Sequence, residues 1–304
     1  MKKSRSTTIL KNSLVIAIIF FIKLYSIIAF AQSTSKVAYT PPANNLLETN
    51  SGFTIYQNLR YGPIPDSIDS STSDRILDLY LPKSKADKIS YPIFFFIHGG
   101  GFTGGDKNVK DICTKMVNKG FAVVSINYRL TLKYKKAPGS SCSANMAEGL
   151  PKNGQFHPLL QTAINNASQD AAMALTWVKE NAIKYNLDIN KLVVSGGSAG
   201  SMTALHLAYV SKQKIIPIKA VINLWGGLEN ASVIKKDAPP LLTYHGDKDD
   251  IINVAYAYAI NDRMKGIKSN KSQLIILKDK GHALYKLIGE EKIDEIVSFI
   301  KNVM

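Results

Sequence analysis

Short apolar runs alternate with longer amphipathic segments along most of the chain. Several runs are apolar at consecutive positions, which is typical of strands buried on both faces and therefore of a mostly parallel sheet. The runs of strand length are Arg75–Leu81, Pro92–Ile97, Phe121–Ile126, Lys191–Ser195, Ala220–Leu224, Leu241–Tyr244 and Gln273–Leu277.

Helical patterns fall between these runs. In the clearest, Gln169–Lys184, apolar residues recur at Ala171, Leu175 and Val178, the spacing of one helix face. Other helices are expected from Ala199 onward and over Val254–Lys265 and Glu291–Asn302. The repeated order of strand, crossover helix and strand predicts an α/β doubly wound sheet with helices on both faces.

Two segments do not follow this alternation. Residues 32–52 are polar and contain proline, and we predict a flexible lead-in to a domain over 53–304. Residues at about 130–166 are rich in Gly, Pro, Ser and Asn and are too many for an ordinary connection. We interpret them as a lid-like insertion in that domain.

The N-terminus has the pattern of an export signal. Basic residues precede an apolar run, Leu14–Phe30, and Ala29–Ala31 supplies a small-x-small cleavage site. The sequence therefore predicts a signal peptide over 1–31, cleavage after Ala31 and a secreted or periplasmic product without a stable membrane span. The alternative is an uncleaved anchor, because roughly 17 to 25 apolar residues can cross a bilayer.

Charge and cysteine content narrow the function classes. The 38 lysines and arginines outnumber the 23 acids and give a net charge of +15, which favours acidic surfaces or substrates. No basic stripe interleaved with aromatic residues is present in the sequence, so nucleic acid is not an expected partner. The sequence has two cysteines, Cys113 and Cys142, and leaves undecided whether they form a disulfide. Their spacing does not indicate a metal site.

The stretch Val193–Met202, VVSGGSAGSM, contains the pattern Gly-x-Ser-x-Gly centred on Ser198. It follows a predicted strand and precedes a predicted helix, which is the context of a nucleophile elbow. Small neighbours permit the tight turn that exposes the hydroxyl at the carboxyl edge of the sheet. The alternative is a plain flexible loop.

A serine nucleophile needs a base, and the base needs an orienting carboxylate. In the fold that carries a nucleophile elbow, the chain order is Ser, acid, His. Four histidines are excluded as the base by this order or by their distance from Ser198: His98, His157, His206 and His245. His282 is therefore the predicted base. The predicted acid lies in the loop that follows Leu241–Tyr244, where Asp247, Asp249 and Asp250 compete.

The run His98–Phe102, HGGGF, follows another predicted strand. Backbone N–H groups of Gly100 and Gly101, with that of Ala199, are predicted to form an oxyanion hole. A phosphate-binding loop is excluded because Asp106 separates Gly105 from the lysine that follows. The spacing Gly-x-Gly-x-x-Gly is also missing around Ser198, which disfavours a dinucleotide cofactor.

From about Asp78 to its end the chain resembles the α/β-hydrolase superfamily, and within it esterases of the hormone-sensitive-lipase-like and bacterial feruloyl or acetylxylan esterase type. The motifs that carry the resemblance are DLYLP (Asp78–Pro82), IHGGGF (Ile97–Phe102), NYRL (Asn127–Leu130), QDAAMALTWVKENAIKYNLD (Gln169–Asp188), GGSAG (Gly196–Gly200), HGDKDDIINV (His245–Val254) and GH (Gly281–His282). The resemblance implies carboxylic ester hydrolysis by Ser198, Asp249 and His282 without a cofactor. Asp249 is the acid that matches the family's H-G-x-x-D run. Gly197 stands where lipase-like members usually carry Asp, which favours the feruloyl-esterase-like branch.

Two other functions stay open at this point. One is an exopeptidase of the prolyl-oligopeptidase type, and the other is a catalytically silent binding protein on a hydrolase scaffold. Phe102 and Trp225 are candidates for the substrate pocket, with ordinary core packing as the alternative. The expected partner is a small-molecule or polysaccharide-linked ester, while the sequence indicates neither the acyl group, nor the alcohol, nor the oligomeric state.

Overall fold

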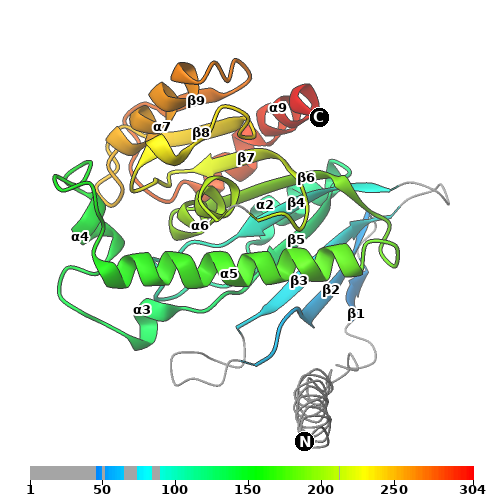
Figure 1. The fold of residues 1–304 in the computed structure, drawn as a ribbon. Coiled ribbons are helices and arrows are strands. Elements are labelled where there is room, and N and C mark those ends of the chain that lie inside the picture. Colours follow the sequence, from blue (N-terminus) through cyan, green and yellow to red (C-terminus); the bar gives the residue numbers. More distant parts are fainter. Residues whose placement is uncertain (1–45, 50–51, 65–73, 84–89, 212) are drawn as a thin grey trace, which may run out of the picture. The chain divides into compact units, whose positions relative to one another are not determined.

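A mixed β-sheet runs through the centre of the protein (Figure 1). The computed structural model describes residues 46–49, 52–64, 74–83, 90–211 and 213–304. Within them nine strands have the order β1-β2-β3-β5-β4-β6-β7-β8-β9. The strands are β1 (Leu46–Thr49), β2 (Phe53–Arg60), β3 (Ile76–Pro82), β4 (Tyr91–Ile97), β5 (Ala122–Ile126), β6 (Leu187–Gly197), β7 (Ile218–Leu224), β8 (Leu241–Gly246) and β9 (Gln273–Leu277).

The strands from β5 to β9 in this order are parallel, and β1, β2 and β3 add antiparallel pairs at one side. The predicted α/β fold with a mostly parallel sheet is confirmed. Cα partners at the carboxyl ends are Ile97 with Gly196 and Gly197 with Leu224, so β4, β6 and β7 end at one edge. The loops that follow these strands therefore meet there.

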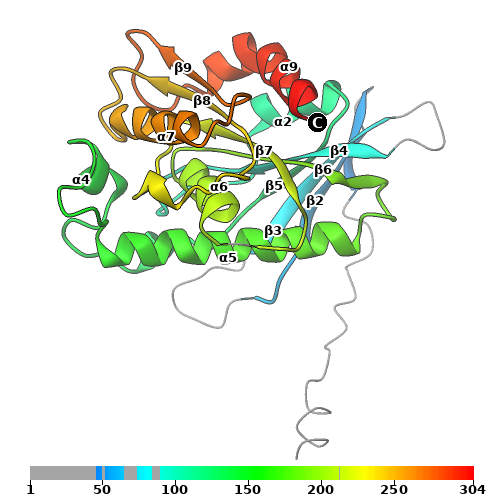
Figure 2. The same cartoon turned by 45° about the horizontal axis from the view of Figure 1, so that its top comes forward.

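Helices cover both faces of the sheet (Figures 1 and 2). The helices are α2 (Lys110–Asn118), α3 (Thr131–Tyr134), α4 (Cys142–Met146), α5 (Pro158–Glu180), α6 (Ala199–Tyr209), α7 (Ala255–Gly266), α8 (Tyr285–Leu287) and α9 (Ile293–Val303), with short helical turns at Ala231–Val233 and Ile288–Lys292.

Strand β4 shows how one apolar run serves two cores. Ile93, Phe95 and Ile97 join the cluster with residues of α5, α6 and α7. Phe94 and Phe96 join the opposite cluster with residues of α2 and α9. Successive side chains of a strand point to opposite faces, so a strand covered on both sides is apolar at every position.

The structure differs from the sequence prediction at three places. Residues 46–49 of the predicted flexible lead-in form β1, which pairs with β2, a strand the apolar pattern did not indicate. Helix α5 begins at Pro158, eleven residues before its predicted start. The insertion at 130–166 contains α3, α4 and the first turns of α5. The start is explained by Pro158 at the first position and by His157, whose Nδ1 accepts the N–H of Leu159 at 3.1 Å.

The disulfide between Cys113 and Cys142, which the sequence leaves undecided, is not formed. Cys113 and Cys142 are both free and buried, and they belong to the clusters on opposite faces of the sheet. The sheet between them prevents the approach that a bridge requires. Burial in apolar surroundings raises the pKa of each thiol to about 12.

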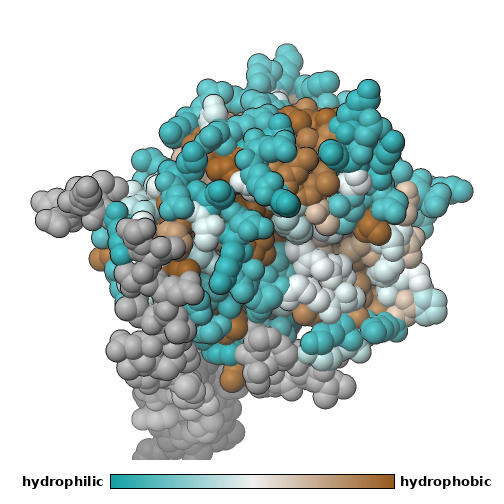
Figure 3. All heavy atoms as spheres, turned by 180° about the vertical axis from the view of Figure 1, so that it is seen from behind, coloured by the Kyte–Doolittle hydropathy of each residue, from teal (hydrophilic) through white to brown (hydrophobic). Residues whose placement is uncertain are grey.

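The surface agrees with this division between core and exterior. Hydrophilic residues cover much of the face seen from behind, with smaller hydrophobic areas between them (Figure 3). The predicted signal peptide over 1–31 lies outside the described residues. Among the residues that are described, no helix combines the length and the apolar character needed to cross a membrane.

Candidate active site

Ser198 occupies the turn between β6 and α6. Its φ of 54° and ψ of −122° are sparsely populated for a residue with a side chain, a conformation that costs about 1–3 kcal/mol. The turn is held because the N–H of Ser198 donates to the carbonyl of Leu224 at 2.9 Å and its own carbonyl accepts from Met202 at 2.9 Å. The strain is thus compensated by the neighbouring strand and by the first turn of α6.

Two glycines beside Ser198 are required by backbone contacts. A Cβ on Gly200 would lie 2.0 Å from the carbonyl oxygen of Ile97 and 2.4 Å from that of His98. A Cβ on Gly196 would lie 2.4 Å from the carbonyl carbon of Gly200. Neither contact can be relieved by a side-chain rotation. The glycines around Ser198 therefore allow the strand, the turn and the helix to pack together.

The structure brings Ser198, His282 and Asp249 together from three loops. Nε2 of His282 lies 2.8 Å from Oγ of Ser198. Nδ1 of the same ring lies 2.7 Å from Oδ2 of Asp249. Because a carboxylate only accepts, Nδ1 carries the ring hydrogen and Nε2 is free to accept from the serine hydroxyl. The competing Asp247 and Asp250 are both exposed.

Asp249 follows β8, and its side chain is fully buried. Burial favours the neutral carboxyl, but hydrogen bonds from His245, His282 and the N–H of Ile252 outweigh burial and lower the pKa of Asp249 below its usual value. Its Oδ1 also accepts the N–H of Ile251 at 3.0 Å. The carboxylate is therefore ionised and held in place from several sides.

His245 contacts Asp249, an interaction that the sequence did not reveal. Sequence order excludes it as the base, and the structure places its Nε2 3.3 Å from Oδ2 of Asp249 and 2.7 Å from the carbonyl of Ile252. A carbonyl only accepts, so Nε2 carries the hydrogen. His245 thus fixes the acid loop rather than receiving a proton from Ser198.

The loop that carries Gly100 and Gly101 lies beside the nucleophile. Gly100 and Gly101 have φ of +108° and +61°, and the carbonyl of Gly100 accepts the N–H groups of Thr103 and Gly104. A Cβ on the preceding Gly99 would lie 3.3 Å from Cβ of Ser198. Ala199 is the first residue of α6, where backbone N–H groups have no partner within the helix. Their role in an oxyanion hole stays a prediction.

Comparison with known proteins finds a family model and solved structures that are similar to this chain. The BD-FAE family model matches residues 77–142 and 156–226. A truncated carbohydrate esterase from gut microbiota superimposes with a TM-score of 0.57 at 19% identity, covering 86% of this chain and 98% of that one. Esterase 2 of Thermogutta terrifontis, phosphoramylated by tabun, gives 0.59 at 16% identity, with 84% and 96% covered. The chain has the fold of the α/β-hydrolases.

Curated relatives of this chain include a medium-chain fatty acyl-CoA hydrolase precursor of Anas platyrhynchos, 30% identical over 138 residues, or 45% of this chain and 21% of the relative. Esterase LipI of Mycobacterium tuberculosis is 29% identical over 132 residues, or 43% and 32%. The chain thus spans only about a fifth to a third of the length of these relatives. The interruption of the family match lies inside the insertion at 130–166.

The two predicted pocket residues lie in the interior of the protein. Phe102 and Trp225 each have 0% exposure. Phe102 packs edge-on against Tyr128, with ring centroids 6.2 Å apart. Trp225 lies 5.0 Å from the ring of Tyr285 and 6.4 Å from that of His282. Both rings are covered by core neighbours and neither lines a cavity described below, which agrees with the alternative of ordinary core packing. Their role in a substrate pocket stays a prediction.

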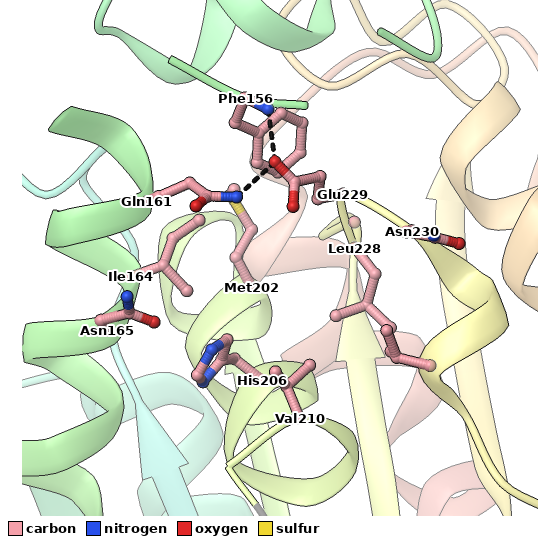
Figure 4. A pocket seen from close by; sticks show the side chains of 12 residues that line it. Phe156, Gln161, Ile164, Asn165, Met202, His206, Val210, Leu228, Glu229 and Asn230 are labelled. Atoms are coloured by element: carbon pink, nitrogen blue, oxygen red, sulfur yellow. Dashed lines mark hydrogen bonds between the residues drawn. The ribbon is translucent and has the colours of Figure 1, made fainter. Parts of the chain in front are cut away.

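An apolar cavity of about 270 Å³ opens next to α6 instead (Figure 4). Its walls come from α5, α6, the insertion and the chain after β7, with the lining residues Phe156, Gln161, Ile164, Asn165, Met202, His206, Val210, Gly227, Leu228, Glu229, Asn230 and Val233. The carboxylate of Glu229 accepts from the N–H of Phe156 and from the side-chain amide of Gln161. This side chain ties the insertion to the cavity rim.

Sequence reasoning missed the lining of this cavity. Glu229 and Phe156 carry no motif, and they meet only because the insertion folds back over the end of β7. A second cavity, of about 520 Å³, lies beside Gly99 and Gly100 and is also lined by Tyr285, which the sequence analysis did not single out. Among the described residues, no cluster of His, Cys, Asp and Glu side chains is suited to hold a metal ion.

Proposed function

We propose that the protein is a serine esterase that hydrolyses carboxylic esters through Ser198, His282 and Asp249. The observation that carries the proposal is the continuous chain of hydrogen bonds, 2.8 Å from Ser198 to His282 and 2.7 Å from His282 to Asp249. A strained, glycine-flanked serine joined to a histidine and a buried carboxylate is the arrangement that activates a hydroxyl for acyl transfer. The similarity to esterases supports the same reaction class.

In the first half of the reaction, Oγ of Ser198 attacks the ester carbonyl carbon. Nε2 of His282 takes the hydroxyl proton as the new C–O bond forms and the carbonyl electron pair moves to oxygen. Asp249 stays ionised and stabilises the imidazolium. When the tetrahedral intermediate collapses, the bond to the alcohol breaks and the imidazolium returns its proton to the leaving oxygen.

Negative charge on the carbonyl oxygen needs donors in place before the reaction. The N–H groups of Gly100, Gly101 and Ala199 would supply them, and losing one such donor costs roughly a hundred- to a thousandfold in rate. In the second half, His282 removes a proton from water as the water attacks the acyl carbon. When this second intermediate collapses, the bond between the acyl carbon and Oγ of Ser198 breaks, the imidazolium returns its proton to Oγ, and the acid product leaves. No step requires a cofactor.

The substrate proposed is a small-molecule or polysaccharide-linked ester. The cavity of about 270 Å³ beside α6 would take an apolar acyl or aryl group, since a dry cavity of about 150 Å³ is enough for benzene. Met202, one helical turn after Ser198, belongs to its wall. Export through a signal peptide over 1–31, with a secreted or periplasmic product, is part of the proposal.

The test compares ester and amide substrates with one nucleophile variant. Wild type should hydrolyse short p-nitrophenyl esters, and Ser198→Ala should lower this turnover by about a thousandfold or more. Ser211→Ala, which changes an exposed serine two residues after α6, is the matched control and should retain full activity. Turnover of an aminoacyl p-nitroanilide in preference to esters would indicate an exopeptidase. A folded wild type that cleaves neither would indicate a binding protein, and either result overturns the proposal.

A further inference from the structure

The hydroxyl of Tyr285 lies between the two glycine loops of the active site. Tyr285 begins α8, three residues after His282. Its oxygen lies 2.6 Å from the position of a Cβ on Gly99 and 2.3 Å from that of a Cβ on Gly197. Gly99 belongs to the loop of Gly100 and Gly101, and Gly197 precedes the nucleophile. One phenol therefore contacts both loops.

Tyr285 explains why residue 197 is a glycine. Gly197 is not among the glycines with positive φ, so its backbone conformation accepts a side chain. The three atoms nearest to a Cβ at this position all belong to the phenol of Tyr285, at 2.3, 2.6 and 2.7 Å. The ring occupies the space that a side chain at residue 197 would need.

Two tyrosines contact the peptide group between His98 and Gly99. The hydroxyl of Tyr128 donates to the carbonyl of His98 at 2.9 Å. On the other side, the hydroxyl oxygen of Tyr285 packs against Gly99. The ring of Tyr285 is itself supported edge-on by Trp225, at 5.0 Å and 86°. A hydrogen bond and a packing contact therefore hold this peptide immediately before Gly100.

We propose that Tyr285 is a positioning residue that, together with Tyr128, fixes the peptide before Gly100 and thereby the oxyanion donors of the loop relative to Ser198. The inference rests on the proposed esterase function. It follows from the sensitivity of acyl transfer to geometry, because a displacement of about 1 Å can lower a rate a hundredfold. Burial raises the pKa of Tyr285 to about 12, so the phenol keeps its proton at neutral pH.

Tyr285→Phe removes the hydroxyl oxygen that contacts both glycine loops while preserving the ring against Trp225. We expect kcat for a short p-nitrophenyl ester to fall about 10- to 100-fold, with KM and the unfolding midpoint nearly unchanged, because only transition-state stabilisation is lost. Tyr128→Phe should lower kcat in the same way, since it frees the other side of the same peptide. Tyr258→Phe, which removes an exposed hydroxyl on α7, is the matched control. Turnover by Tyr285→Phe within about twofold of wild type would overturn the inference.

A second set of variants tests the contact with the glycines. Gly197→Ala should lower kcat at least 100-fold, and adding Tyr285→Ala should raise it above that single variant, because the obstructing atoms are gone. Gly99→Ala should show no such rescue, since the carbonyl oxygen of Gly197 remains 2.8 Å from its Cβ. Absence of rescue at Gly197, or equal rescue at Gly99, contradicts the assignment.

These outcomes are distinguishable from failure of the proposed function. If Ser198→Ala abolishes ester turnover and Tyr285→Phe leaves it unchanged, the esterase proposal stands and the role of Tyr285 is wrong. If wild type itself has no ester turnover that Ser198→Ala removes, the esterase proposal falls, and the positioning role falls with it.

Discussion

The two ends of helix α6 lie in opposite environments. At its first turn, Gly200 is so close to the carbonyl of Ile97 that an added Cβ would lie 2.0 Å away. Further along, Met202, His206 and Val210 line a cavity of about 270 Å³ (Figure 4). One helix thus begins beside the proposed nucleophile, where backbone packing leaves no room for an added Cβ, and further along forms a wall with space for a ligand.

The difference lies in which atoms make the contacts. Around Gly200 the neighbours are backbone atoms at the end of β4, whose position is fixed by pairing with strands on both sides. Around the cavity the neighbours are side chains, which can be exchanged without moving a strand. Such an arrangement keeps the reaction geometry constant while the binding space can vary between related proteins.

The largest effect is expected from a change to the buried carboxylate of Asp249, which contacts His282 beside Ser198. Asp249→Asn keeps the shape but favours the wrong tautomer of His282, and kcat should fall about 10⁴-fold. Steady-state turnover of a p-nitrophenyl ester measures the loss. Asp247→Asn and Asp250→Asn are matched controls, because both side chains are exposed in the same loop. A comparable loss in either control would assign the acid to a different residue.

The next effect tests the backbone packing itself. Gly200→Ala should lower the free energy of unfolding by about 3 kcal/mol or more and abolish ester turnover, because the methyl group has to displace β4 or α6. Gly266→Ala, at the end of α7, has no atom within 4 Å of the added carbon and should change stability by less than about 1 kcal/mol. Denaturant titration of both variants makes the comparison. Equal stability of the two would mean that the first turn of α6 can relax.

The sequence predicts the residues at the start of α6 and around Ser198 better than it predicts those that line the cavity. Ser198 and His282 follow from chain order and from the strands before them, since parallel strands bring their carboxyl ends to one edge. The acid was narrowed to three aspartates by position and to Asp249 by the family resemblance, and burial separates Asp249 from its two exposed neighbours. Apart from the motif around Ser198 and the resemblance that selects Asp249, these inferences need only topology, which apolar periodicity reports well.

Contacts between side chains that are far apart in the sequence leave no comparable pattern in it. Tyr128 and Tyr285 both contact the peptide between His98 and Gly99, yet they lie 157 positions apart in the sequence. The start of α5 at Pro158 was available as a helix-start signal, but the glycines and serines before it favoured a loop. The wall formed by Phe156 depends on Glu229, a partner that only the folded chain reveals.

The smallest effect concerns the cavity end and its dependence on pH. Burial lowers the pKa of His206 to about 4, from 6.5. The unfolded chain therefore binds more protons than the folded one between these values. The contribution of His206 to stability is fully present above pH 6.5 and is lost progressively as the pH falls toward 4. Preferential protonation of His206 in the unfolded chain should by itself lower the free energy of unfolding by about 1 to 2 kcal/mol as the pH falls from 7 to 5.

His206→Gln isolates this contribution, because glutamine is neutral throughout the range. His98 has its pKa lowered to about 4 by burial and changes stability in the same direction, but it is common to both proteins and cancels in the difference. Denaturant titrations at several pH values should therefore show a smaller slope for the variant, and parallel curves would contradict the assignment. If the two ends of α6 are independent, the variant also keeps wild-type turnover of a short ester. A change in that turnover would mean that the cavity wall influences the nucleophile two helical turns away.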